Sequence, residues 1–330
     1  MKNKFKTIKR VSAILICMIT IGILCLTVWN KALSIKENKN LQEIGENVEV
    51  NGINMRISKE GDGEKTIVLL SGLGTPDPII DFKPLAEKLG RNYKVVTLEY
   101  PGYGLSDDTD EERSSENIVQ DIREALRKSG AEPPYILMPH SISGIYCMQY
   151  MNSYPEEVAA MIGIDSSVPE QARYDEMEQV SGSIYNIAKL MDITGLSRLS
   201  YISGNDVTQN MKDSGNYSNE DINNILSIMS RKSITKAQFN EMQSFQNNCQ
   251  SLFDKRYPAD IPVLFLLSNE SCEEYEKKYT DITWDGVHEQ TISNPLIQKI
   301  EYLQGKHYLH WTQADKISDM TDEFIRKYVQ

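Results

Sequence analysis

The chain has 330 residues, of which 25% are charged and 40% are hydrophobic, and its formal net charge is −12. This length supports one large hydrophobic core or two modest ones, and the composition is that of an ordinary globular protein. The first ten residues contain five basic residues and no acid, so the rest of the chain is more acidic still. Such a body would repel nucleic acid and anionic lipid surfaces, and no nucleic-acid partner is expected.

Residues 11–29 form a run of nineteen residues without a charge. A helix of this length crosses the hydrocarbon core of a bilayer, and the basic segment 1–10 before it places the amino terminus in the cytoplasm. A cleaved signal peptide is the alternative, but the run exceeds the usual apolar region and no A-x-A-like site follows it. We expect an uncleaved signal-anchor in the cell membrane, a single-pass topology and an extracytoplasmic body.

Residues 30–46 are rich in Lys, Asn and Glu and are interpreted as a linker. From residue 47 onward, apolar runs typical of strands alternate with helical patterns. The expected strands are a hairpin over Val48–Ile57, then Thr66–Leu70, Tyr93–Leu98, Tyr135–Met138 and Val158–Ile164, and the expected helices include Leu85–Leu89 and Glu116–Ser129. This alternation predicts a mostly parallel, doubly wound α/β sheet.

The alternation stops between Asp165 and Ile261, where only helical patterns occur. An insertion of this length without a strand predicts a helical cap, residues 166–260, over the carboxyl edge of the sheet. The core is therefore expected to comprise residues 47–165 and 261–330. Its second part contains the strands Ile261–Leu267 and Ile297–Leu303 and a terminal helix from Gln313 to Tyr328.

One stretch within the core has the pattern of a nucleophile elbow. The apolar run Tyr135–Met138 is followed by Pro139-His-Ser-Ile142 and then by apolar residues at a spacing of three, namely Ile145, Met148 and Met151. A strand that turns sharply into a helix exposes the side chain at the turn and directs the first helical N–H groups at its target. Ser141 lies at that turn and is the candidate nucleophile.

The cysteines give no sign of a metal site or a disulfide framework. Cys17 and Cys25 lie in the expected anchor, and Cys147, Cys249 and Cys272 are few and widely separated. No metal and no cofactor is therefore expected.

Residues 47–330 resemble the α/β-hydrolase superfamily, in particular its capped serine hydrolases. The resemblance rests on five blocks in the order of the family: Leu70-Ser-Gly-Leu-Gly74, Pro101-Gly-Tyr-Gly-Leu-Ser-Asp107, His140-Ser-Ile-Ser-Gly144, Tyr154-Pro-Glu-Glu-Val158 and Gly305-Lys-His307. Ser71 departs from the usual His-Gly, and Pro139 and Ser143 replace the glycines that usually flank the nucleophile.

The resemblance implies acyl transfer with the chain order nucleophile, acid, histidine. His307 follows Gly-Lys at the position that the family uses for its general base. The intermediate needs hydrogen-bond donors for its oxyanion, and the backbone N–H groups of Leu73 and Ile142 are the candidates.

Two carboxylates can complete the triad. In much of the family the acid follows the strand that here is Ile261–Leu267, and Glu270 is near that place in an irregular-looking loop. Asp165 ends the preceding strand, a position that some branches use. Because a strand end is fixed more firmly than a loop, Asp165 is favoured and Glu270 is the alternative.

The predicted function is that of a membrane-anchored serine hydrolase acting on a small-molecule ester or acyl substrate, as a carboxylesterase or lipase-like enzyme does. Amide or peptide hydrolysis, as by a proline aminopeptidase, is the enzymatic alternative. The altered elbow also leaves open a catalytically inactive α/β-hydrolase-like binding module.

Overall fold

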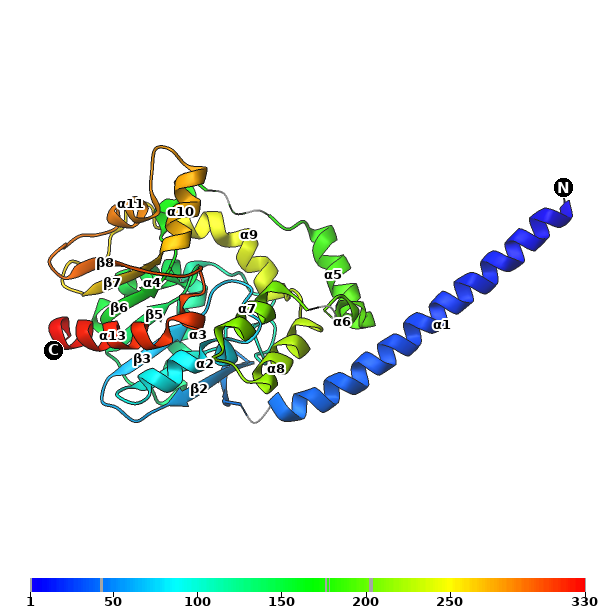
Figure 1. Ribbon diagram of the computed structural model, residues 1–330, viewed down its shortest axis with the longest axis horizontal. Coiled ribbons are helices and arrows are strands. Elements are labelled where there is room, and N and C mark those ends of the chain that lie inside the picture. Colours follow the sequence, from blue (N-terminus) through cyan, green and yellow to red (C-terminus); the bar gives the residue numbers. More distant parts are fainter. Residues whose placement is uncertain (1, 42–43, 176, 178, 202–203, 330) are drawn as a thin grey trace.

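The computed structural model describes residues 2–41, 44–175, 177, 179–201 and 204–329 (Figure 1). One eight-stranded sheet has the order β1-β2-β4-β3-β5-β6-β7-β8. Its strands are β1 Glu46–Val50, β2 Ile53–Glu60, β3 Thr66–Leu70, β4 Lys94–Leu98, β5 Tyr135–Pro139, β6 Val158–Ile164, β7 Val263–Ser268 and β8 Gln298–Leu303. The β1–β2 and β2–β4 pairs are antiparallel and the other pairs are parallel, so the predicted mostly parallel sheet is confirmed.

Helices cover both faces of the sheet. On one face, α2 (Pro78–Leu89) and α13 (Ala314–Tyr328) pack on strand residues such as Ile67 and Leu69. On the other face, α3 (Ser115–Ser129) and α4 (Ser143–Ser153) pack on residues such as Val68 and Leu137. This division follows from the period of two along a strand, which sends alternate apolar side chains into the two layers.

Local signals set the ends of these helices. Asp77 caps α2 by accepting the N–H of Ile80, and a proline occupies the first helical position. At α3, Ser114 caps the amino end and Gly130 closes the carboxyl end in the left-handed conformation.

The insertion between β6 and β7 is helical, as expected. It contains η2 Pro169–Arg173, α5 Gly182–Thr194, α6 Leu196–Ser200, α7 Asp206–Ser214, α8 Asn219–Met229 and α9 Lys236–Ser251. No strand occurs among the described residues between η2 and α9. Capping boxes begin α8 at Ser218 and α9 at Thr235.

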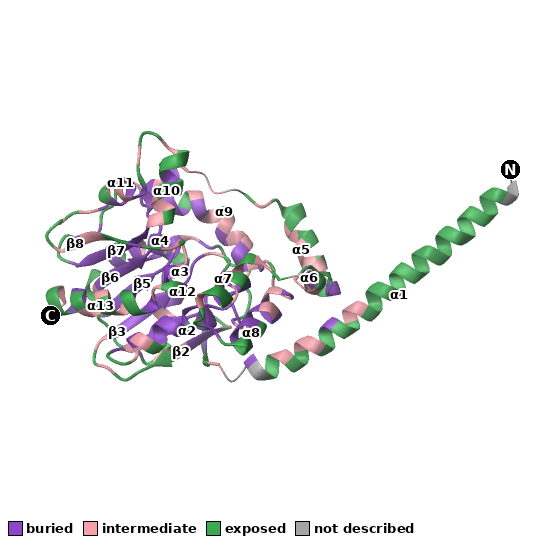
Figure 2. Cartoon of the chain, viewed as in Figure 1, coloured by how far each residue is buried: buried purple, intermediate pink, exposed green. Residues whose placement is uncertain are grey.

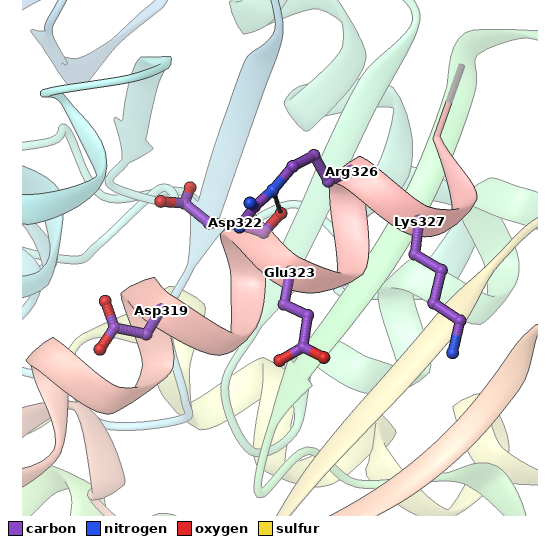
Figure 3. A pocket seen from close by; sticks show the side chains of 5 residues that line it. All are labelled: Asp319, Asp322, Glu323, Arg326 and Lys327. Atoms are coloured by element: carbon purple, nitrogen blue, oxygen red, sulfur yellow. Dashed lines mark hydrogen bonds between the residues drawn. The ribbon is translucent and has the colours of Figure 1, made fainter.

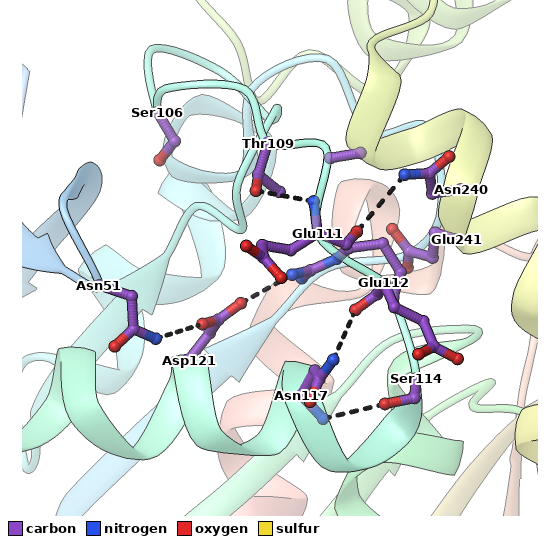
Figure 4. A network of polar contacts seen from close by, with 12 residues as sticks. Asn51, Ser106, Thr109, Glu111, Glu112, Ser114, Asn117, Asp121, Asn240 and Glu241 are labelled. Atoms are coloured by element: carbon purple, nitrogen blue, oxygen red, sulfur yellow. Dashed lines mark hydrogen bonds and ion pairs between the residues drawn. The ribbon is translucent and has the colours of Figure 1, made fainter.

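Polar contacts join the cap to the core, and Figure 4 shows the region around Glu241 and Asp121. Glu241 of α9 accepts hydrogen bonds from the hydroxyls of Tyr103 and Tyr146, at 2.7 and 2.6 Å. Arg113, whose charge acts on Glu241, pairs with Asp121 at 2.7 Å. Burial raises the pKa of Glu241 although the Arg113 charge opposes this shift. The two tyrosine hydroxyls therefore fix α9 against the elbow helix α4 and the loop after β4.

Helix α1 (Lys2–Leu41) extends away from the body (Figure 1) and is exposed over most of its length (Figure 2). It is long and apolar enough to span a membrane. It also continues into the expected linker 30–46, as far as Leu41. Arg198 of α6 pairs with Glu37 at 2.7 Å, and Ser227 of α8 bonds the same carboxylate, so cap contacts stabilise the helix. Residues 42 and 43 of that linker lie outside the described residues.

Two helices connect β7 to β8, namely α10 (Asn269–Lys278) and α11 (Trp284–Glu289). The loop expected around Glu270 is therefore the first turn of α10. Ser268, the last residue of β7, caps this helix by accepting the N–H of Ser271, so α10 begins directly at the end of the strand.

Candidate active site

Ser141 lies between β5 and α4, at the turn where the sequence predicts the nucleophile. Its φ is 54°, in the left-handed region that non-glycine residues rarely adopt. The surrounding structure holds this conformation, since the Ser141 carbonyl accepts the N–H groups of Gly144 and Ser167 at 3.0 and 2.8 Å. A strained residue held at a strand–helix turn is typical of a functional site.

The residues that depart from the usual elbow pattern have structural roles. The buried Ser143 hydroxyl lies 2.7 Å from the Tyr100 hydroxyl and also donates to the Ser71 carbonyl. Gly144, one position later, allows the helix backbone to approach Ser167 closely, because a Cβ there would lie 2.1 Å from the Ser167 carbonyl oxygen. The elbow therefore forms with a serine in place of the second glycine.

His307 and Asp165 are brought together by the loops after β8 and β6. His307 Nδ1 lies 2.7 Å from Asp165 Oδ2. Because a carboxylate only accepts hydrogen bonds, Nδ1 carries the proton, and Nε2 of the neutral imidazole keeps its lone pair. The Asp165 side chain is fully buried, whereas that of His307 is 41% exposed. The imidazole is therefore accessible to a substrate while the hydrogen bond to Asp165 fixes its orientation.

Three further groups donate to the Asp165 carboxylate. They are the Ser268 N–H at 3.0 Å, the Ser271 hydroxyl at 2.5 Å and the Trp284 indole N–H at 3.1 Å. Burial by itself would raise the pKa of Asp165, but the hydrogen bond from His307, the positive charge that His307 carries when protonated, and the hydrogen bonds from Ser271 and Ser268 outweigh it, so this pKa is lowered. Asp165 is therefore kept ionised. Sequence reasoning missed all three donors.

Glu270 lies apart from this arrangement. It is exposed on the first turn of α10, and His307 pairs with Asp165 instead.

His310, three residues after His307, pairs with buried Asp81 at 2.7 Å, and Trp311 donates to the same carboxylate. This second histidine–aspartate pair ties the short helix α12 (Leu309–Thr312) to α2.

The loop after β3 lies directly against the elbow. A Cβ on Gly72 would lie 2.9 Å from Ser141 Cβ, so only glycine permits this approach. Gly74, with φ +75°, completes the turn, and Leu73 stands between the two glycines. For neither Leu73 nor Ile142 do the described residues provide an acceptor for the backbone N–H.

His140 is a site residue whose role the sequence did not indicate. It is completely buried, and its ring centroid lies 4.6 Å from that of His307. Its Nε2 lies 3.2 Å from the His307 carbonyl oxygen. The structure has no hydrogen bond between Ser141 and His307 among the described residues, and His140 is the residue that links the two.

A polar hollow elsewhere on the surface lacks this combination of groups. A surface hollow on α13 is lined by Asp319, Asp322, Glu323, Arg326 and Lys327, which offer charges but no nucleophile beside a base (Figure 3). Within the described residues, no three His, Cys, Asp or Glu side chains are grouped to hold a metal ion.

Comparisons with known proteins show which family the chain belongs to. The family model of the alpha/beta hydrolase fold matches residues 65–312. An uncharacterized protein of Bacillus subtilis, YbdG, is 28% identical over 331 aligned residues, which cover 99% of each chain. The pimeloyl-[acyl-carrier protein] methyl ester esterase of Aliivibrio salmonicida is 29% identical over 108 residues, covering 33% of this chain and 38% of the esterase.

The solved structures give the same fold. The epoxide hydrolase VrEH1 of Vigna radiata superposes with a TM-score of 0.63 at 19% sequence identity, covering 86% of this chain and 97% of that one. The family match spans most of the chain and includes the strands β3 to β8. The chain belongs to the α/β-hydrolase fold family of hydrolytic enzymes.

Proposed function

We propose that this hydrolase is a membrane-anchored serine esterase with Ser141 as nucleophile, His307 as general base and Asp165 as the acid. The observation that carries the proposal is the 2.7 Å hydrogen bond between His307 and the buried Asp165, beside a strained serine at a strand–helix turn. An unaided serine hydroxyl is a weak nucleophile, and an oriented imidazole is what activates it.

The proposed reaction proceeds through an acyl-enzyme. Ser141 Oγ attacks the ester carbonyl carbon while its proton passes to His307 Nε2, and Asp165 stabilises the resulting imidazolium. The N–H groups of Leu73 and Ile142 would donate to the oxyanion. The imidazolium then protonates the leaving alcohol as the C–O bond breaks. Water, deprotonated by His307, attacks the acyl-serine, and the acid product leaves as Ser141 regains its proton.

The nucleophile favours an ester over an epoxide as substrate, although epoxide hydrolases are among the structural neighbours. A serine that opened an epoxide ring would be left as an alkyl ether, which general-base catalysis by water does not cleave. A serine that attacks an ester is left as an acyl ester, which this base can hydrolyse. Similarity to a methyl ester esterase over a third of the chain supports the same choice.

The membrane part of the proposal rests on α1. The uncharged run 11–29 lies within this helix, and its most apolar window is entirely unburied in the protein. The basic residues before the run favour a cytoplasmic amino terminus and a catalytic body on the other side of the membrane. A lone protruding apolar helix of this length needs a non-aqueous partner, and a bilayer provides one.

The test is hydrolysis by the full-length protein purified in detergent. The substrates are nitrophenyl esters of graded acyl length, aminoacyl amides and an aryl epoxide. We expect ester hydrolysis with slow or no turnover of the amides and the epoxide, and loss of ester turnover in Ser141→Ala. Faster turnover of the amides would make the protein an amide hydrolase. A folded protein inactive on every substrate would favour a binding role.

A further inference from the structure

The two cap helices beside α1 present apolar side chains to solvent. Ile184, Ile187, Leu190 and Ile193 on α5 are each between 58% and 60% exposed, and Leu196 and Leu199 of α6 are exposed as well. Single exposed apolar residues are common, but a regular spacing of three makes a continuous surface. We call these six residues the apolar stripe.

The stripe is held in place by the opposite side of α5. The Tyr185 ring packs on Phe239 of α9, with centroids 4.8 Å apart. The buried Asp192 carboxylate accepts hydrogen bonds from the Ser233 N–H and the Ser197 hydroxyl. The outward direction of the stripe is therefore set by specific contacts with the rest of the cap.

The charge of this segment contrasts with that of the chain. Residues 181–201 contain only three charged residues, Lys189, Asp192 and Arg198. Asp192 is buried and Arg198 is paired with Glu37 of α1. The stripe thus presents an apolar surface without an exposed carboxylate in a protein whose net charge is −12. Such a surface can enter a bilayer without a carboxylate having to be desolvated, and the ammonium group of Lys189, 4.0 Å from Asp108, can stay in water at the level of the headgroups.

Contacts with α1 fix where the stripe lies along the axis of this helix. Asn30 donates to the Asp192 carbonyl at 2.9 Å and accepts from Arg198 Nε at 2.7 Å. Gly195, between α5 and α6, packs on Asn30, since a Cβ there would lie 2.8 Å from Asn30 Cβ. Asn30 directly follows Trp29, the last residue of the uncharged run. In a spanning α1, this tryptophan lies at the membrane–water interface.

We propose that the apolar stripe lies in the boundary between headgroups and acyl chains of the same bilayer that α1 spans. The inference rests on the proposed anchoring by α1 and adds the cap as a second membrane contact. In Figure 1, α5 and α6 lie on the side of the body that faces α1, where its apolar run ends. Amphipathic helices held at this level bury their apolar face in the boundary region. The occupant of the stripe is phospholipid, and because the stripe is apolar it needs no anionic headgroup.

Site-specific fluorescence quenching tests this placement in the full chain. Cys17→Ala, Cys25→Ala and Cys272→Ser remove three cysteines, while Cys147 and Cys249 are buried.

An environment-sensitive dye is attached to Ile187→Cys or Leu190→Cys on the stripe. The matched control is Leu296→Cys, which is 77% exposed and precedes β8, away from α1. The protein is reconstituted in phosphatidylcholine vesicles with and without brominated acyl chains.

We expect the brominated lipid to remove most of the dye fluorescence at positions 187 and 190 and to leave position 296 unchanged. Unquenched dye at both stripe positions, in a protein that resists carbonate extraction, would overturn the cap placement while the anchor stands. A blue-shifted but unquenched dye in cross-linkable dimers would assign the stripe to a second copy of the chain. Release by carbonate would show that the anchor itself is wrong, and the inference would fall with it.

Discussion

His140 Nε2 lies 3.2 Å from the carbonyl oxygen of His307, so the residue before the proposed nucleophile holds the backbone of the proposed base. Burial lowers the pKa of His140 well below its usual range, and the nearby His307 and His310 act in the same direction. His140 is therefore neutral, and its Nε2–H donates to the carbonyl. This contact fixes the turn that carries the His307 imidazole.

The variant pair His140→Leu and His140→Gln separates this hydrogen bond from simple packing. Leucine fills the space but cannot donate, whereas the glutamine amide can donate from a similar position. Loss of one buried hydrogen bond corresponds to about 1–2 kcal/mol, so kcat of His140→Leu should fall about tenfold with KM little changed. Steady-state kinetics on the best ester would measure this, and His140→Gln should recover part of the loss.

Thermal unfolding of the same two variants supplies the control. Equal kcat values in two variants of equal stability would show that the His140 hydrogen bond does not position His307.

Asp165→Asn should lower kcat by roughly three orders of magnitude, because the amide cannot stabilise the imidazolium and favours the wrong tautomer of His307. Glu270→Gln should be close to the native protein, since Glu270 is exposed on α10. Both are measured as kcat and KM on one ester. The reverse ranking would transfer the acid role to Glu270, and two mild effects would count against a triad.

Two buried carboxyl groups, those of Asp77 and Glu99, predict that the free energy of unfolding depends on pH. Asp77 is buried where it caps α2, and burial raises its pKa to about 6. Burial and the charge of Asp77 also raise the pKa of Glu99. A carboxyl whose folded pKa exceeds its unfolded value stabilises the fold fully below the unfolded pKa, and this contribution is lost as the pH rises through the folded value.

The native protein should therefore lose free energy of unfolding, on the order of 1 kcal/mol or more, between about pH 4 and pH 7 through this pair. Asp77→Asn still accepts the Ile80 N–H but cannot ionise, so its loss over the same range should be smaller. Urea unfolding at several pH values gives the comparison. An unchanged pH dependence in Asp77→Asn would show that the protonation of another group causes the change in stability.

Local sequence was sufficient to predict the elements that position Ser141. The β5 strand, the turn at Ser141 and α4 are contiguous, and their apolar spacing and small residues determine the structure directly. The end of β6 was likewise predictable as a place for Asp165. Asp165 and His307 are 142 residues apart, and whether they meet depends on the paths of two loops. The sequence alone could therefore not exclude Glu270 as the acid.

What the sequence did not show are contacts between distant segments. Trp284 donates to Asp165 across 119 residues, and no local pattern marks it as a site residue. The expected linker after the anchor is helical as far as Leu41, where Arg198, 161 residues away, pairs with Glu37 and stabilises the helix. Composition indicates which segments can be unstructured, but tertiary contacts decide whether they are.

The central claim is that Ser141 is an activated nucleophile, and covalent labelling by a fluorophosphonate tests it most directly. Only a serine whose proton is taken by a base reacts at a useful rate. Mass spectrometry of the full-length protein should find one adduct, on the peptide that contains Ser141, and Ser141→Ala should abolish it. Ser143→Ala, which removes the neighbouring hydroxyl, should still be labelled. Labelling that persists in Ser141→Ala, or a folded native protein that is never labelled, would contradict the account.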